Sequence, residues 1–184
     1  MGDSDLSAGG SPPAGPVSLP DLIRAGDAHA FAGFRDSHMG MVRAYCEVAC
    51  APVLVTGACE AAFLDFVGRM STGDQSFEAA PSLEAVLLAA TRSAAASRFA
   101  APAIEATPRG RRHPTPSTQT RVCAAMPELL AARANGEFRG DERAVTDHVA
   151  GCMLCAATEA RLRAAEAAFS TAAVRRAGTA EGAT

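Results

Sequence analysis

The chain is predicted to be all-helical, with a larger helical unit and a smaller helical unit joined by a linker. No stretch shows the apolar–polar alternation of a half-buried strand, whereas apolar residues recur at helical spacing between recognisable helix ends. Four prolines lie among polar groups between residues 101 and 120, a composition typical of linkers. These observations predict one helical unit over residues 19–100 and another over 121–176.

The two ends of the chain are expected to lie outside these units. Residues 1–18 hold too few apolar groups to form a core, which predicts disorder, and residues 177–184 are expected to fray. No apolar run approaches the ~20 residues that span a bilayer, and the N-terminal segment does not have the basic-apolar pattern of a signal peptide. We therefore expect a cytoplasmic protein without a membrane segment.

The unit over residues 19–100 has one clear amphipathic helix. Asp27 can accept hydrogen bonds at the N-terminus of this helix. Phe31, Phe34, Val42 and Tyr45 follow at i, i+3, i+11 and i+14, which places them on one helix face. This stripe is expected to face a helical core.

The unit over residues 121–176 also has readable boundaries. Asp141 can cap a helix over residues 142–150, and Gly151 is a residue that commonly ends helices. An upstream helix is expected to carry residues 127–134. An alanine-rich helix is expected to run on to Arg176.

Four soft ligands in this unit predict a structural zinc site. His148, Cys152 and Cys155 form a His-x3-Cys-x2-Cys run, and Cys123 precedes the histidine by 25 residues. Thiolates and imidazoles bind tetrahedral Zn²⁺ in closed sites, and Cys-x2-Cys near a histidine is a zinc spacing. Packing as ordinary small buried residues is the alternative for all four, and Asp147 or water is the alternative to Cys123.

The segment around these ligands resembles the zinc-binding anti-sigma domain of bacteria. Its parts follow the family's order: Pro-Glu-Leu-Leu at 127–130, Asn-Gly-Glu-Phe at 135–138, Asp-Glu-Arg at 141–143, and the ligand run at 148–155. The resemblance covers Cys123 to about Phe169. It implies a small helical domain that binds a sigma factor and keeps it from RNA polymerase.

Residues 19–100 resemble region 2 of extracytoplasmic-function sigma factors. The resemblance rests on Gly26-Asp27, Ala30-Phe31, Phe34, His38, Val42 and Tyr45, then on Ala58 to Val67, and then on Ala85-Val86-Leu87-Leu88, Ala90-Thr91-Arg92 and Arg98. It implies that Glu60 and Phe63 contact the polymerase. It also implies that Arg92 and Arg98 contact promoter DNA.

The sigma-like unit departs from its family pattern. Glu60 is the one polar anchor left where the family has an Asp-x-x-Gln-Glu stretch, and the second DNA-reading helix-turn-helix of a sigma factor is missing. Residues 20–100 hold 6 Arg against 9 Asp or Glu, a net charge of −3. Because proteins that grip DNA phosphates present a basic face, independent DNA binding is not expected.

We therefore expect a transcription regulator that acts through protein contacts, a zinc anti-sigma-like domain fused to a degenerate sigma region 2. The alternative is an atypical sigma factor with a built-in zinc regulatory domain. The expected partner is a sigma factor or the chain's own sigma-like unit, with core RNA polymerase as a further candidate. No enzymatic activity is expected, because four protein ligands close the metal site and no catalytic motif is present.

Apolar helix faces are the expected partner-binding surfaces. The candidates are Leu129 and Leu130 before the ligand run, then Leu154, and then Leu162 and Phe169, which are seven residues apart on one helix face. The alternative is that they complete the zinc unit's own small core.

Three further cysteines lie in the 19–100 unit. Cys46 and Cys50 are four residues apart on one helix face, and Cys59 follows. Free cysteine behaves as a small buried hydrophobe, so core packing is expected for all three. An oxidisable pair or half a metal site is the alternative.

Overall fold

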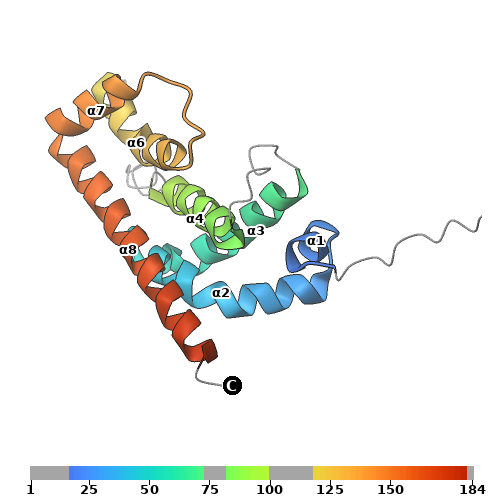
Figure 1. Cartoon of the computed structure of the whole chain (residues 1–184). Helices are drawn as coiled ribbons and strands as arrows, with labels where there is room; N and C mark the ends of the chain where they lie inside the picture. Colours follow the sequence, from blue (N-terminus) through green and yellow to red (C-terminus); the bar gives the residue numbers. More distant parts are fainter. Residues whose placement is uncertain (1–16, 73–81, 100–117, 182–184) are drawn as a thin grey trace, which may run out of the picture.

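The computed structural model describes residues 17–72, 82–99 and 118–181, and within these ranges every regular element is a helix (Figure 1). The elements are α1 (Leu19–Arg24), α2 (Ala28–Ala49), the 3₁₀ helix η1 (Pro52–Leu54), α3 (Val55–Ser71), α4 (Leu83–Phe99), α6 (Thr118–Ala134), α7 (Glu142–Gly151) and α8 (Met153–Glu181). The all-helical prediction is confirmed for the described residues. Most of the expected linker and of the expected disordered N-terminus lies outside them, and α8 extends into the range expected to fray.

Helix α2 begins where the sequence predicts. Gly26 precedes it with a φ of 80°, in the left-handed region that residues with a side chain rarely adopt. Asp27 then caps the helix, because its Oδ1 accepts hydrogen bonds from the backbone N–H groups of His29 (2.9 Å) and Ala30 (2.8 Å). A cap of this kind stabilises a helix by about 1 kcal/mol.

The apolar stripe of α2 faces the larger core, as predicted. Phe34, Val42 and Tyr45 are buried, and Phe31 is half-buried against the same core. The ring of Phe34 stacks on that of Phe66 in α3, with 4.8 Å between the ring centroids. Aromatic stacking of this kind adds to the burial of apolar area that holds α2 on α3.

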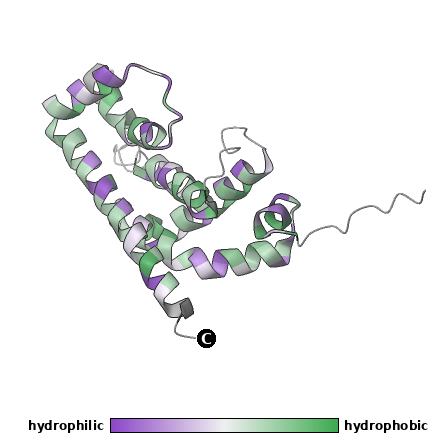
Figure 2. Cartoon of the chain, in the orientation of Figure 1, coloured by the Kyte–Doolittle hydropathy of each residue, from purple (hydrophilic) through white to green (hydrophobic). Residues whose placement is uncertain are grey.

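Helix α4 lies among the other helices and is coloured mostly hydrophobic in Figure 2. Its buried face includes Leu87 and three alanines, Ala90, Ala94 and Ala95. Small side chains let neighbouring helices approach closely, and the distance between two packed helices depends on the residues at the contact. The sequence's alanine bias is therefore compatible with a dense core.

A second, smaller core lies between α6, α7 and the first half of α8. Its buried residues are Met126, Leu130, Val145, Val149, Cys155 and Leu162. Helix α8 continues past this core and runs alongside α2 (Figure 1), where Ala165 and Phe169 enter the larger core. One helix thus belongs to both cores and joins them.

Candidate metal centre

Helix α7 positions the histidine ligand. Its cap is Asp141, whose Oδ1 accepts hydrogen bonds from the backbone N–H groups of Arg143 (2.9 Å) and Ala144 (3.2 Å). The helix ends at Gly151, within one residue of the predicted end. His148 therefore lies on the last turn of α7, next to the non-helical residue Cys152 that leads into α8.

The two cysteines of the Cys-x2-Cys pair lie at the junction of α7 and α8. The backbone at Cys152 is extended (φ −124°, ψ 109°), which separates the two helices. The Cys152 carbonyl accepts a hydrogen bond from the N–H of Ala156 at 2.9 Å, so the first turn of α8 starts there. Cys155 lies on that turn, and both sulfurs can reach one point.

The fourth ligand comes from α6, which extends further towards the N-terminus than the predicted 127–134. Cys123 lies one turn before Pro127, and proline has no N–H to donate to the Cys123 carbonyl. Met126 fixes this stretch of α6 by side-chain packing instead, because it is 1% exposed in the smaller core. Packing against α7 and α8 therefore brings Cys123 to the other ligands.

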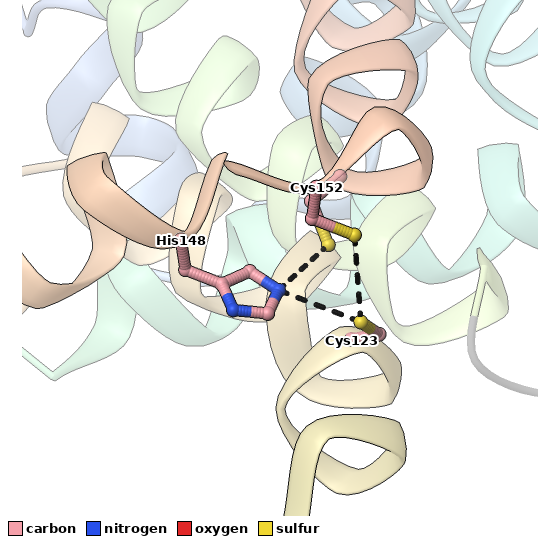
Figure 3. A group of neighbouring side chains, drawn as sticks. Cys123, His148 and Cys152 are labelled. Carbon is pink, nitrogen blue, oxygen red and sulfur yellow. Dashed lines mark hydrogen bonds between the residues drawn. The ribbon is translucent and has the colours of Figure 1, made fainter. Parts of the chain in front are cut away.

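The four ligand atoms form one compact cluster (Figure 3). Nε2 of His148 lies 3.4 Å from Sγ of Cys123 and 3.3 Å from Sγ of Cys155. The sulfurs of Cys123 and Cys152 are 3.8 Å apart, and all four atoms lie within 4.8 Å of one another. The cluster can therefore hold a metal ion through four side chains.

The ionisation of the thiols depends on burial and on their mutual contacts. Burial, reinforced by the Cys152 and Cys123 thiols, raises the pKa of Cys155 to about 12. A hydrogen bond from the Cys155 backbone lowers the pKa of the Cys152 thiol. Since metals bind the thiolate, a metal ion held here would have to displace a proton from Cys155, and binding at neutral pH would release protons.

Three sulfurs and one nitrogen could supply four ligands to one metal ion, which would leave no position for solvent in a tetrahedral shell. Asp147, the alternative to Cys123, is exposed and lies 3.7 Å from Arg143 in an ion pair. Closed shells of thiolate and imidazole are typical of structural metal sites, whereas catalytic sites keep a position open. The chemistry that the geometry supports is stabilisation of the fold by a bound ion.

The arginines that the resemblance assigns to DNA are engaged within the chain. Nε of Arg92 lies 2.7 Å from the carboxylate of Glu166 in α8, and its Nη1 donates to Oδ1 of Asn135 at 3.3 Å. The Arg92 side chain is 16% exposed. Arg98 is half-buried and donates to the Ala94 carbonyl of its own helix at 3.4 Å. The C-terminal unit therefore occupies the polar groups of Arg92.

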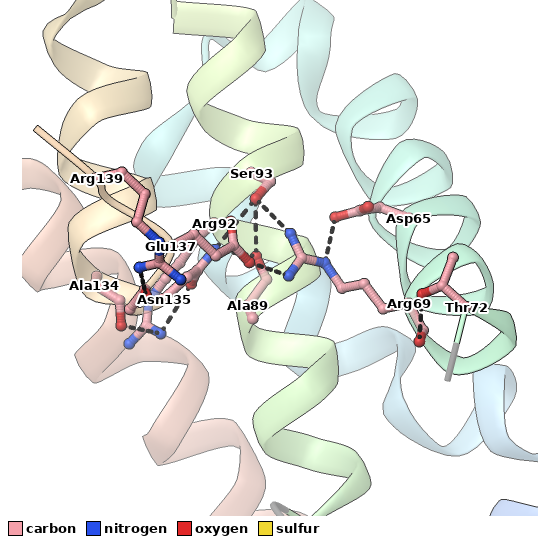
Figure 4. Close-up of polar contacts among 11 residues, drawn as sticks. Asp65, Arg69, Thr72, Ala89, Arg92, Ser93, Ala134, Asn135, Glu137 and Arg139 are labelled. Atoms are coloured by element: carbon pink, nitrogen blue, oxygen red, sulfur yellow. Dashed lines mark hydrogen bonds and ion pairs between the residues drawn. The ribbon is translucent and has the colours of Figure 1, made fainter. Parts of the chain in front are cut away.

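The turn between α6 and α7 lies against α3 and α4 (Figure 4). Gly136, with a φ of 72°, lets the chain turn after α6. Nδ2 of Asn135 donates to the Ala89 carbonyl of α4 at 3.2 Å, and Glu137 forms an ion pair with Arg69 of α3. Sequence reasoning noted this Asn-Gly-Glu stretch only as part of a resemblance and missed its contacts.

Arg161 makes a further contact that sequence reasoning missed. From α8 it donates to the carbonyls of Val48 (2.7 Å) and Cys50 (3.2 Å), at the C-terminal end of α2. Its guanidinium also lies 5.1 Å from the centre of the Phe99 ring. Helix C-termini carry unsatisfied carbonyls and a partial negative charge, so an arginine there supplies both hydrogen bonds and charge.

The residues assigned to polymerase contact separate into one exposed and one buried side chain. Glu60 is exposed on α3. Phe63 is 4% exposed and packs edge-on against Phe31, with 6.4 Å between ring centroids, so it is a core residue. Leu64, its neighbour, is the exposed apolar side chain of this stretch at 75%.

The apolar partner-binding candidates mostly face inward. Leu130 and Leu162 are buried in the smaller core, and Leu129 packs half-buried against that core. Phe169 is buried in the larger core. Leu154 is exposed. Four of the five candidates thus make contacts within the chain itself.

Comparisons with protein-family models, curated proteins and solved structures gave no match. Among the described helices, none combines the length and the apolar character needed to cross a membrane.

Proposed function

We propose that this chain is a transcription regulator in which a zinc-binding anti-sigma-like unit is fused to a degenerate sigma region 2-like unit. The donor set supports zinc as the metal, because soft thiolates disfavour hard cations such as Mg²⁺ and Ca²⁺. Zn–S and Zn–N bonds of about 2.3 Å and about 2.0 Å in a tetrahedron separate two sulfurs by about 3.8 Å, and a sulfur and nitrogen by about 3.5 Å. The corresponding separations in the cluster are 3.8 Å, and 3.3 and 3.4 Å.

The observation that carries the regulatory role is the contact of the metal-binding unit with the sigma-like helices. Glu137 and Glu166 of the C-terminal unit pair with Arg69 and Arg92, whose side chains are 17% and 16% exposed. Carboxylates thus occupy arginines that could otherwise meet phosphate. This favours action through protein contacts over action through DNA.

In vitro transcription with purified components tests the proposal. The full-length, zinc-loaded chain is titrated into reactions that contain core RNA polymerase and one of a panel of extracytoplasmic-function sigma factors. The expected result is loss of the transcript that depends on one of these sigma factors, together with a stable complex of the two proteins. Cys152→Ser plus Cys155→Ser should abolish the effect, and Arg143→Ala should keep it. The proposed role is contradicted if the chain neither binds nor inhibits any of the sigma factors tested.

An atypical sigma factor with a built-in zinc regulatory unit is the second candidate. The exposed side chains of Glu60 and Leu64 favour it, since they leave part of α3 open to a large partner. In this case the chain alone should direct core polymerase to make a promoter-dependent transcript. Glu166→Ala, which removes the ion pair of Arg92, should raise the amount of transcript, and Glu142→Ala is the matched control. Absence of any transcript with both variants excludes this candidate.

A further inference from the structure

Three free thiols belong to the buried cluster that forms the larger core, away from the metal cluster. Cys46 lies on α2, Cys50 at its C-terminal end, and Cys59 on α3. Cys46 has no exposed surface, and Cys50 and Cys59 are each 5% exposed. The Cys46 thiol hydrogen-bonds with the Cys50 and Cys59 thiols, and these contacts, together with burial, raise its pKa.

Helix geometry disfavours a covalent bond between Cys46 and Cys50. The N–H of Cys50 donates to the Cys46 carbonyl at 2.8 Å, so these two residues are one helical turn apart. Side chains at that spacing have Cβ atoms about 5–6 Å apart. A disulfide requires the two Cβ atoms to lie about 3.5–4.5 Å apart. Cys59 comes from a different helix, so its side chain can approach Cys46 without this restriction.

A groove leads from solvent to Cys59. It has a volume of about 850 Å³, lies between α1, α2 and α3, and its wall includes Phe31, Met39, Phe63 and Cys59. Arg43 also lines it. A small uncharged molecule can therefore reach this sulfur, whereas Cys46 and Cys50 are not among the lining residues.

The surroundings of Cys59 favour its reactive form. The hydrogen bond with the Cys46 thiol, assisted by the positive charge of Arg43, lowers the pKa of Cys59, although burial opposes the shift. The thiolate is the nucleophilic form of cysteine. Of the three thiols, Cys59 thus combines access with activation.

We propose that Cys59 and Cys46 form a disulfide when the chain meets hydrogen peroxide, with the groove as the route of access. The Cys59 thiolate attacks one peroxide oxygen, the O–O bond breaks, and hydroxide leaves, giving a sulfenic acid at Cys59. The Cys46 sulfur then attacks the Cys59 sulfur. The S–S bond forms, the S–O bond breaks, and the Cys46 proton leaves with the hydroxyl group as water. Two thiols are oxidised and one peroxide is reduced to two waters, independently of the proposed transcriptional role.

Peroxide titration of the full-length, zinc-loaded chain tests this. Bound zinc is measured in each sample, and the remaining thiols are blocked before digestion. Cleavage after Arg43, Glu47 and Glu60 gives one peptide over 44–47 with Cys46 and another over 48–60 with Cys50 and Cys59. The expected result is oxidation of two of the six cysteines and a cross-link between these two peptides, with zinc retained.

Matched variants identify the bond. Cys50→Ala should leave the cross-link yield unchanged, whereas Cys59→Ala should abolish it. Cys46→Ala should stop the reaction at the sulfenic acid, which dimedone traps at Cys59. A first disulfide that contains Cys50 or a cysteine of the metal cluster overturns the proposal, and so does a chain whose six cysteines all stay reduced. If a variant fails to fold, tandem fragmentation of the wild-type cross-link assigns the bond.

Discussion

Phe169 should be one of the main supports of the fold, because it anchors the metal-binding unit's last helix in the other unit's core. Its side chain is 4% exposed and belongs to the larger core. Truncation of a buried phenylalanine to alanine costs about 3–5 kcal/mol. Each 1 kcal/mol shifts the Tm of a domain of 150–250 residues by about 2–4 °C. Phe169→Ala should therefore lower the Tm by roughly 6–20 °C.

The assay is thermal melting of the zinc-loaded chain, monitored by its far-UV circular dichroism signal. Val174 lies five residues further along the same helix and is 73% exposed, so Val174→Ala is the matched control and should change stability by less than about 0.5 kcal/mol. A Phe169→Ala chain within about 1 kcal/mol of wild type would refute the conclusion that α8 is packed into the larger core. Equal losses in both variants would refute the assignment to this side chain.

Three further predictions follow from the site and from the charge distribution. Cys152→Ser plus Cys155→Ser should abolish zinc binding and lower helicity, since structural zinc contributes on the order of 10 kcal/mol, and unchanged zinc by elemental analysis would contradict this. Arg92→Ala should cost about 1–3 kcal/mol in urea unfolding because Glu166 loses its partner, whereas the exposed Arg143→Ala should be near neutral, and equal effects would refute the contact. In a gel-shift assay at physiological salt, the full chain, with a net charge of −3, should not bind promoter DNA at micromolar concentration, and a salt-sensitive shift would revive the sigma-factor alternative.

Features that depend on residues close in sequence could be predicted. The caps at Asp27 and Asp141 each involve groups within three residues, so the local pattern contains all the partners. The same holds for His148, Cys152 and Cys155, which lie within two adjacent helix ends. Three cysteines and one histidine in one small unit are most simply explained as metal ligands. This made Cys123 the first candidate for the fourth ligand, although it is distant in sequence.

The residue pairs through which the C-terminal helices contact α3 and α4 could not be predicted. Arg92 and Glu166 are 74 residues apart, and each looks like an ordinary solvent-exposed charge in its own helix. The alanine-rich α8 has no continuous stripe of large apolar residues to reveal which face it buries. Phe63 was assigned to polymerase contact, yet Phe63 is buried and its neighbour Leu64 is exposed. The sequence of a Phe-Leu pair alone does not indicate which of the two side chains faces outward.

The sharing of α8 between two cores has a consequence for how the chain is assembled. The segment over residues 118–181 supplies both the metal ligands and part of the larger core, so the two halves recognise each other by contact and not only through their peptide connection. Joining two contacting halves in one chain raises the concentration of each around the other, typically to about the millimolar range. The chain is in this respect an internal complex, a candidate for fragment complementation in which two separately made pieces reconstitute one fold.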